Sequence, residues 1–133
     1  MRSLRSTFLG VVLAGAAAHA ADRLHAGNWE YSLVTEGETR KLTSCVTADQ
    51  AAEFNADSKT GRAAAEKKAG TRCTVKSYEA NGETVSYTLV CGDRTITDVT
   101  HYRGETSEGE KTTTAAGKVT VTRVTAKRLG PCP

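Results

Sequence analysis

The sequence predicts a small all-β protein with one short helix, stapled by disulfides. Apolar and polar residues alternate along six or seven segments, which is the period of half-buried strands. Glycine-containing turns separate these segments at short intervals, as expected for consecutive hairpins. The elements fit an antiparallel meander curled into a small open or closed barrel, and a two-sheet sandwich is the alternative.

The first twenty residues have the organisation of a signal peptide. Two arginines precede an apolar run at 8–18, and Ala18-His19-Ala20 is a small-x-small cleavage site. The run is too short to span a membrane, so we expect cleavage after Ala20 and not an integral membrane protein. A single small β domain, 21–133, would then be released into the periplasm.

The composition of the expected mature chain excludes a basic nucleic-acid surface. Loss of Arg2 and Arg5 leaves 16 basic residues against 15 acidic ones, interleaved along the chain, for a net charge of +1. Only 21 residues are Val, Leu, Ile, Phe, Tyr or Trp, which makes a thin core. Four cysteines without a Cys-x-x-Cys pair favour two disulfides over a zinc site, each bridge contributing about 2–4 kcal/mol.

The amino-terminal half contains two expected strands and the helix. The strands are expected at 28–35 and 39–46, joined by a turn that contains Gly37. Thr47 can cap a short helix that continues to residue 56. Residues 57–70 have few apolar anchors, so we interpret them as a mobile surface connection with at most one helical turn.

Residues 71–91 predict a β-hairpin with a cysteine on each arm. A two-residue turn at Asn81-Gly82 would place the apolar sets of the two arms on opposite faces. A three-residue loop, 80–82, with Gly82 in the left-handed region, instead pairs Val75 with Tyr87 and Cys73 with Leu89. We expect the three-residue loop, in which Cys73 and Cys91 share a face without being opposed.

Three further strands are expected at 94–103, 105–115 and 118–129. The middle one is almost wholly polar, which indicates an edge strand or a strongly solvated strand. In the last strand Val119 and Val121 have one parity and Val124 the other, which predicts a β-bulge near Thr122-Arg123.

The order of several short motifs resembles a known family. The motifs are Gly27-Asn28-Trp29-Glu30, Cys45-Val46-Thr47, Cys73-Thr74-Val75, a strand ending in Cys91, Tyr102-Arg103-Gly104-Glu105-Thr106 and the tail Ala126-Lys127-Arg128-Leu129-Gly130-Pro131-Cys132. Together they resemble the secreted bacterial family of domain of unknown function 3617 over 27–132. The chain differs where that family is rich in methionine, at 111–114, and has Ser107 where an aromatic is usual. The resemblance implies an exported Gram-negative protein and implies no activity.

Four cysteines allow three disulfide pairings. The preferred hairpin register makes Cys73–Cys91 the least expected bridge, because it sets the two residues diagonally. Of the other two pairings we expect Cys45–Cys73 with Cys91–Cys132.

No catalytic, cofactor or metal site is predicted. His101 and Asp98 lie three positions apart in a strand and so on opposite faces, which is a poor arrangement for proton transfer. His25 and His101 lack the partners of a metal site. Trp29, Tyr31 and Tyr87 are candidates for a pocket lining, although the scarcity of other large residues favours a core role.

Export, the disulfide frame and the lack of a catalytic pattern predict a non-enzymatic binding or envelope-associated module. Its partner classes would be a small apolar ligand or an envelope protein, with no cofactor and no nucleic acid. A structural or stress-related secreted protein without a dedicated ligand is the alternative. A small enzyme is the third hypothesis.

Overall fold

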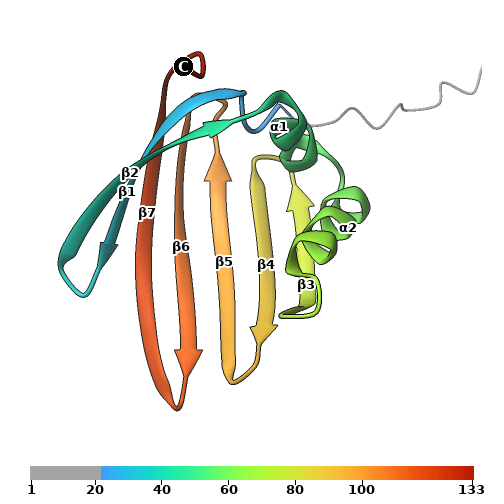
Figure 1. Ribbon diagram of the computed structural model, residues 1–133, viewed down its shortest axis with the longest axis vertical. Coiled ribbons are helices and arrows are strands. Elements are labelled where there is room, and N and C mark those ends of the chain that lie inside the picture. The colour runs from blue at the N-terminus through green and yellow to red at the C-terminus, as the bar shows by residue number, and fades with distance from the viewer. Residues whose placement is uncertain (1–21) are drawn as a thin grey trace, which may run out of the picture.

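The computed structural model describes residues 22–133, which form one antiparallel sheet of seven strands and two helices (Figure 1). The expected signal peptide and its cleavage site lie outside the described residues. The strands are β1 (Gly27–Thr35), β2 (Glu38–Val46), β3 (Thr74–Asn81), β4 (Thr84–Cys91), β5 (Arg94–Tyr102), β6 (Thr106–Ala115) and β7 (Lys118–Gly130). The helices are α1 (Ala48–Asn55) and α2 (Ser58–Ala69).

The sheet is a curled meander with free edges. Its strand order is β2-β1-β7-β6-β5-β4-β3, so β1 returns to pair with the last strand. The outer strands β2 and β3 do not pair with each other, and the sheet is therefore not closed. Figure 1 shows β1 and β2 crossing at an angle to β3–β7, with α2 beside β3. The predicted β class is confirmed, and the seven strands form one sheet, not the two of a sandwich.

The first helix begins where its capping residue predicts. Thr47 Oγ1 accepts a hydrogen bond from the Gln50 amide at 3.2 Å, and Gln50 Oε1 accepts one from the Thr47 amide at 2.9 Å. This reciprocal capping box satisfies two amides that no helical carbonyl can reach.

The mobile connection expected at 57–70 is wrong, because twelve of its residues form α2. Asp57 caps this helix by accepting the Thr60 amide at 2.8 Å, and that bond lowers the pKa of the Asp57 carboxyl. Arg62 pairs with Glu66 one turn later at 2.8 Å. Caps and the high helix propensity of an alanine-rich segment form the helix without large apolar anchors.

The expected three-residue hairpin loop is also wrong. Asn81 pairs with Thr84 around a two-residue turn, in which Gly82 takes the expected positive φ of 56°. A register shift between Val75 and Ser77 then places a β-bulge in β3. The bulge places Val75 on the buried face. Regular pairing from the two-residue turn would have placed Val75 on the opposite face.

The same bulge overturns the expected disulfides. The structure joins Cys73 to Cys91, with 4.2 Å between the two Cα atoms, and Cys45 to Cys132, with 5.4 Å. Neither Cys45–Cys73 nor Cys91–Cys132 forms. Beyond the bulge the register shifts by one residue, which brings Cys73 opposite Cys91.

Two expectations for the carboxyl-terminal strands need correction. The polar strand β6 lies between β5 and β7, so the edge alternative is wrong, whereas the solvated alternative agrees with residues that are all exposed or half-buried. β7 pairs with it continuously from Lys118 to Lys127, so no bulge occurs near Thr122. Val119 and Val121 lie exposed on the outer face of the sheet instead.

The core is small and lies where α1 meets β1 and β7. Trp29 is fully buried there, and its indole Nε1 donates to the His25 carbonyl at 2.9 Å. Four other buried side chains complete this cluster: Leu24, Val46, Ala51 and Ala126. Trp29 is therefore a core residue. Among residues 22–133, no helix is long and apolar enough to cross a membrane.

We predict that the two disulfides differ in their contribution to stability. Cys45–Cys132 closes a loop of 87 residues and Cys73–Cys91 one of 18. Loop-closure entropy gives about 4–5 kcal/mol for the longer loop and about 3 kcal/mol for the shorter one. Urea unfolding should therefore show the larger loss for the Cys45→Ala/Cys132→Ala double variant. Non-reducing peptide mapping that joined Cys45 to Cys73 would contradict the assignment.

Candidate functional site

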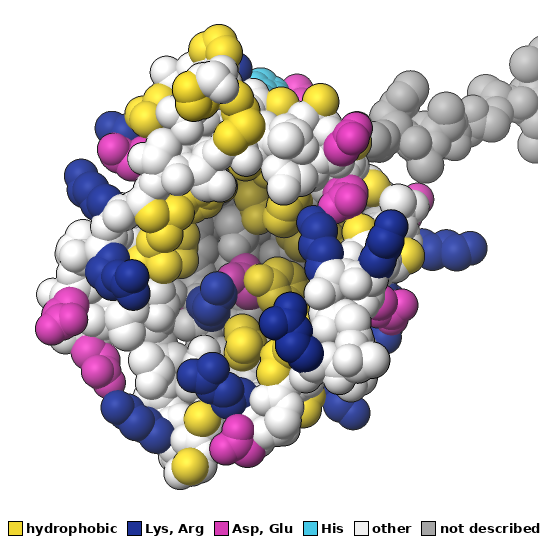
Figure 2. All heavy atoms as spheres, viewed as in Figure 1, with side chains coloured by type: hydrophobic (Ala, Val, Ile, Leu, Met, Phe, Trp, Pro, Cys, Tyr) yellow, Lys and Arg dark blue, Asp and Glu magenta, His cyan; other side chains and the backbone are white. Residues whose placement is uncertain are grey.

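A hollow of about 780 Å³ lies between α2 and the inner, concave face of β3–β5. Figure 2 shows this hollow facing the viewer, with apolar side chains inside it and basic side chains around it. We call it the larger compartment. Its main apolar walls are Phe54, Tyr78, Tyr87, Leu89 and Ile96. The rings of Tyr78 and Tyr87 lie nearly parallel with their centres 6.4 Å apart, and they form one continuous wall.

The hollow exists because α2 turns small residues toward the sheet. Gly61, Ala64, Ala65 and Ala69 are the α2 residues that line the compartment together with Lys68. The Tyr78 ring packs directly against Gly61, where an added Cβ would lie 2.5 Å from the ring. Methyl groups cannot fill the space that leucines would fill, so the helix covers the sheet without forming a solid core.

Basic side chains dominate the edge of this compartment. Lys68, Arg72 and Arg94 line it, and Glu53 is the acidic residue among the lining residues. Glu53 pairs with Lys68 at 2.6 Å, while the Lys68 ammonium also lies 6.0 Å from the centre of the Phe54 ring. Because Glu53 pairs with Lys68, Arg72 and Arg94 give the part of the hollow that they line a net positive charge.

A smaller compartment of about 360 Å³ adjoins the first, and Phe54 and Tyr87 line both. Its apolar walls include Tyr31, Leu33 and Leu42 from β1 and β2. Its polar walls come mainly from β5 and β6 and include Asp98 and Lys111. The inner face of β6 is thus polar because it faces a hollow and not a packed core.

Burial holds the tyrosines of the hollow in their neutral form. It raises the pKa of Tyr31, and it raises the pKa of Tyr87 and Tyr102 further, with the nearby negative charge of Asp98 adding to the effect. Neutral tyrosines supply hydroxyl groups that can donate or accept hydrogen bonds. The walls therefore combine apolar rings with a few polar groups.

The structure separates the residues that the sequence singled out. Trp29 belongs to the core, whereas Tyr31 and Tyr87 line the hollow. His101 lies on the outer face and contacts Thr84 Oγ1 at 2.8 Å, opposite to the side of Asp98, as predicted. Sequence reasoning missed Phe54 and the part that α2 plays. The polar inner positions of β6 were the one signal in the sequence that the inner face of the sheet is not packed.

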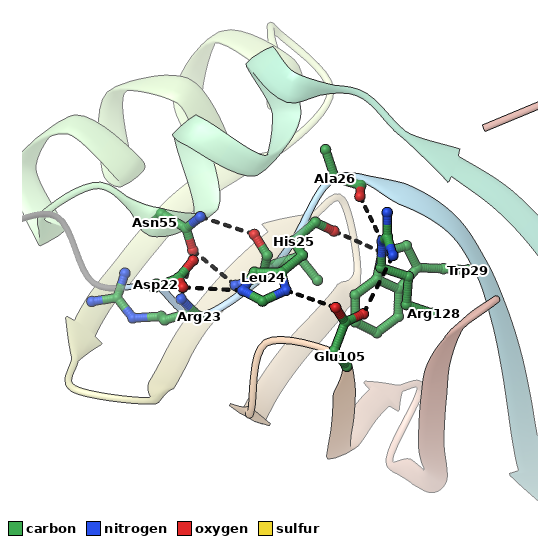
Figure 3. A network of polar contacts seen from close by, with 9 residues as sticks. All are labelled: Asp22, Arg23, Leu24, His25, Ala26, Trp29, Asn55, Glu105 and Arg128. Carbon is green, nitrogen blue, oxygen red and sulfur yellow. Dashed lines mark hydrogen bonds and ion pairs between the residues drawn. The ribbon is translucent and has the colours of Figure 1, made fainter. Parts of the chain in front are cut away.

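The amino-terminal segment fixes the helix that carries Phe54. Arg23 is 5% exposed, and its guanidinium donates to the Phe54 carbonyl at 2.8 Å and the Ala56 carbonyl at 3.0 Å. Figure 3 shows Asn55 reaching back to this segment: its Oδ1 accepts the Arg23 and Leu24 amides at 2.8 and 2.9 Å. These bonds position Phe54 between the two compartments.

His25 links the same segment to the loop between β5 and β6. Its Nδ1 lies 3.0 Å from Glu105 Oε1 and its Nε2 lies 3.0 Å from Asp22 Oδ2 (Figure 3). Hydrogen bonds to Glu105 and then to Asp22 raise the pKa of His25 above its ordinary value of 6.5. The second oxygen of Glu105 lies 3.7 Å from Arg128, whose Nε donates to the Ala26 carbonyl at 2.7 Å.

Comparison with known proteins identifies a family and gives no functional precedent. The family model described as Protein of unknown function (DUF3617) matches residues 24–132. Neither a curated protein nor a solved structure matches the chain.

We predict that the His25 contacts make stability depend on pH. A raised pKa in the folded state means that the contribution is complete below pH 6.5 and is lost as the pH rises through the folded-state value. Urea unfolding between about pH 5.5 and about pH 8 should therefore show a shallower pH dependence for His25→Gln than for the wild type. His101→Gln is the control, because its partner is a hydroxyl and not a carboxylate. Equal slopes for wild type and His25→Gln would refute the prediction.

We predict that Gly61→Ala destabilises the protein although it improves helix propensity. The gain of about 1 kcal/mol expected in a helix is outweighed, because the new methyl group would overlap the Tyr78 ring. Overpacking of this kind costs about 1–3 kcal/mol. Thermal unfolding would measure the loss, with Lys67→Ala on the exposed side of α2 as the control. A Gly61→Ala variant more stable than the wild type would refute the contact.

Proposed function

We infer that this chain, which belongs to the DUF3617 family, is a non-enzymatic periplasmic binding module for a small amphipathic acid. The observation that carries the proposal is the larger compartment, an open hollow with apolar walls and basic residues at its edge. Its volume of about 780 Å³ is in the range typical of small-molecule sites.

The walls favour an apolar body for the ligand. Leu89, Ile96 and the two tyrosine rings offer a surface on which alkyl or ring carbons can replace water. Burying such carbons yields about 25 cal/mol for each Å² removed from water, and the apolar side chains that already face the hollow gain as well. A purely polar ligand would leave these apolar side chains exposed to water and would gain no such free energy.

The charges favour an acidic head group. Arg72 and Arg94 form no ion pair with an acidic side chain among residues 22–133, and both line the larger compartment. A guanidinium binds a carboxylate or phosphate through two parallel hydrogen bonds. An anion at this end would therefore be held in place while its apolar part lies along β4 and β5.

Two observations favour this function over the alternatives. A purely structural protein would gain stability by filling the space under α2, yet that face carries glycine and alanines. An enzyme is less favoured, because His101 and Asp98 lie on opposite faces of β5 and cannot act as a pair. The two disulfides support an oxidising compartment such as the periplasm.

The experiment compares two matched substitutions on β5. Ile96 lines the hollow and Val99 lies on the outer face, 39% exposed. Oxidised protein, 21–133, is titrated with laurate in competition with anilinonaphthalene sulfonate. We expect Ile96→Glu to weaken laurate binding by tenfold or more, because it places a carboxylate against the alkyl chain. Val99→Glu should change the affinity less than about twofold.

Two outcomes would refute the proposal. The first is absence of laurate binding by the wild type, or equal loss in both variants. The second is equal affinity for laurate and for its neutral alcohol, which would leave the arginines without a role in recognition. Circular dichroism of both variants shows whether the fold is retained.

A further inference from the structure

The smaller compartment contains a carboxylate with unused bonding capacity. Asp98 is 9% exposed and accepts a hydrogen bond from Thr100 Oγ1 at 2.7 Å. A carboxylate can accept about four hydrogen bonds. Within residues 22–133 no buried side-chain nitrogen or oxygen lacks a partner, and Asp98 is one of the residues that line the compartment. The bond to Thr100 uses Oδ1, so the second carboxylate oxygen of Asp98 is open to the hollow and to the neighbouring Tyr87 hydroxyl.

A cation stands next to this carboxylate on the neighbouring strand. Lys111 of β6 pairs in register with Asp98 of β5, and both line the smaller compartment. Lys111 nevertheless forms no ion pair with Asp98 or with any other acidic side chain in the described part of the chain. The compartment thus presents a hydrogen-bond acceptor and a hydrogen-bond donor side by side, each free to bind a third group.

The apolar surroundings strengthen hydrogen bonds that Asp98 and Lys111 form with a ligand. Tyr87 and Tyr102 lie close enough to Asp98 for its charge to raise their pKa values, and both are largely buried. Leu33 and Val124 line the same compartment. Hydrogen bonds to charged groups are stronger in such surroundings than in water, and a polar ligand atom that fails to pair there is penalised.

We propose that Asp98 and Lys111 together bind a hydroxyl group of the ligand. The inference rests on the proposed function and narrows it from an amphipathic acid to a hydroxylated amphipathic acid. A hydroxyl donates to Asp98 and accepts from Lys111, so it satisfies both groups at once. A ligand ammonium would be attracted by Asp98 but repelled by Lys111, and a second ligand carboxylate would be attracted by Lys111 but repelled by Asp98, so neither satisfies both groups as a hydroxyl does.

The strand geometry sets the distance between the two ends of the ligand. Arg94 and Asp98 lie on the same face of β5, four residues apart. At the rise of a β-strand they are separated by roughly 13 Å. An acidic head at Arg94 and a hydroxyl at Asp98 would be joined by an alkyl chain of medium length that passes Ile96 and Tyr87. The ligand would then occupy both compartments.

Calorimetric titration with three acids of equal chain length tests the inference. The acids are laurate, ω-hydroxylaurate and ω-aminolaurate. For the wild type we expect ω-hydroxylaurate to bind about tenfold tighter than laurate, the gain of a hydrogen bond to a charged group. The ω-amino acid should bind more weakly than the hydroxy acid.

Three variants assign the preference to its residues. Asp98→Leu should remove the preference while laurate still binds, because an apolar side chain replaces the carboxylate. Asp98→Asn keeps the shape of the side chain and should reduce the preference without abolishing binding. Asp93→Asn, in the exposed turn between β4 and β5, is the control and should retain it.

The outcomes separate this inference from the proposed function. Binding of laurate and ω-hydroxylaurate with equal affinity overturns the hydroxyl site and leaves the acid-binding module standing. Tighter binding of the ω-amino acid than of the hydroxy acid also overturns it. Failure of all three acids to bind overturns both proposals. A preference that persists in Asp98→Leu shows that the hydroxyl is recognised elsewhere and overturns the assignment.

Discussion

The buried guanidinium of Arg23 is the interaction on which the arrangement of helices and sheet depends. It lies among carbonyl oxygens at the carboxyl end of α1, where the helix dipole favours a cation. The backbone of the same residue accepts the Gly104 amide at 2.8 Å, and its side chain also contacts the Gly82 carbonyl. One residue thereby joins α1 to two turns of the sheet. A buried charge without those carbonyls would be strongly unfavourable, so the segment and α1 are ordered together.

This arrangement explains why the protein has a hollow and not a larger core. The free edges β2 and β3 leave one side of the curled sheet open, and α1 and α2 lie on that side (Figure 1). The helices are held by caps, by Arg23 and by a few close contacts such as Gly61 on Tyr78. Their small side chains do not fill the concave face. Disulfides at two separate places on the sheet compensate for the apolar contacts that the hollow leaves out.

Part of the candidate site was visible in the sequence. The alternation of apolar residues along β1 and β4 placed Tyr31 and Tyr87 on an inner face, and both line the hollow. Trp29 has the same parity but lies beside α1, where Leu24 and Ala51 bury it. Asp98 and Lys111 belong to different strands, and only their pairing in register brings them together. Only the structure shows that the inner face is hollow there, and therefore that these two polar side chains line a compartment.

The sequence by itself determined the elements whose causes are local. Strand boundaries follow from alternation and turn glycines, and the start of α1 follows from Thr47 and Gln50. The tertiary structure decided what depends on distant residues. The two-residue turn sets the pairing beside it, and the bulge between Val75 and Ser77 changes the register at the far end of β3. That change buries Val75 and decides the disulfide partners. The polar strand β6 became central for the same reason: its inner residues face a hollow that strands and helices from both halves of the chain enclose.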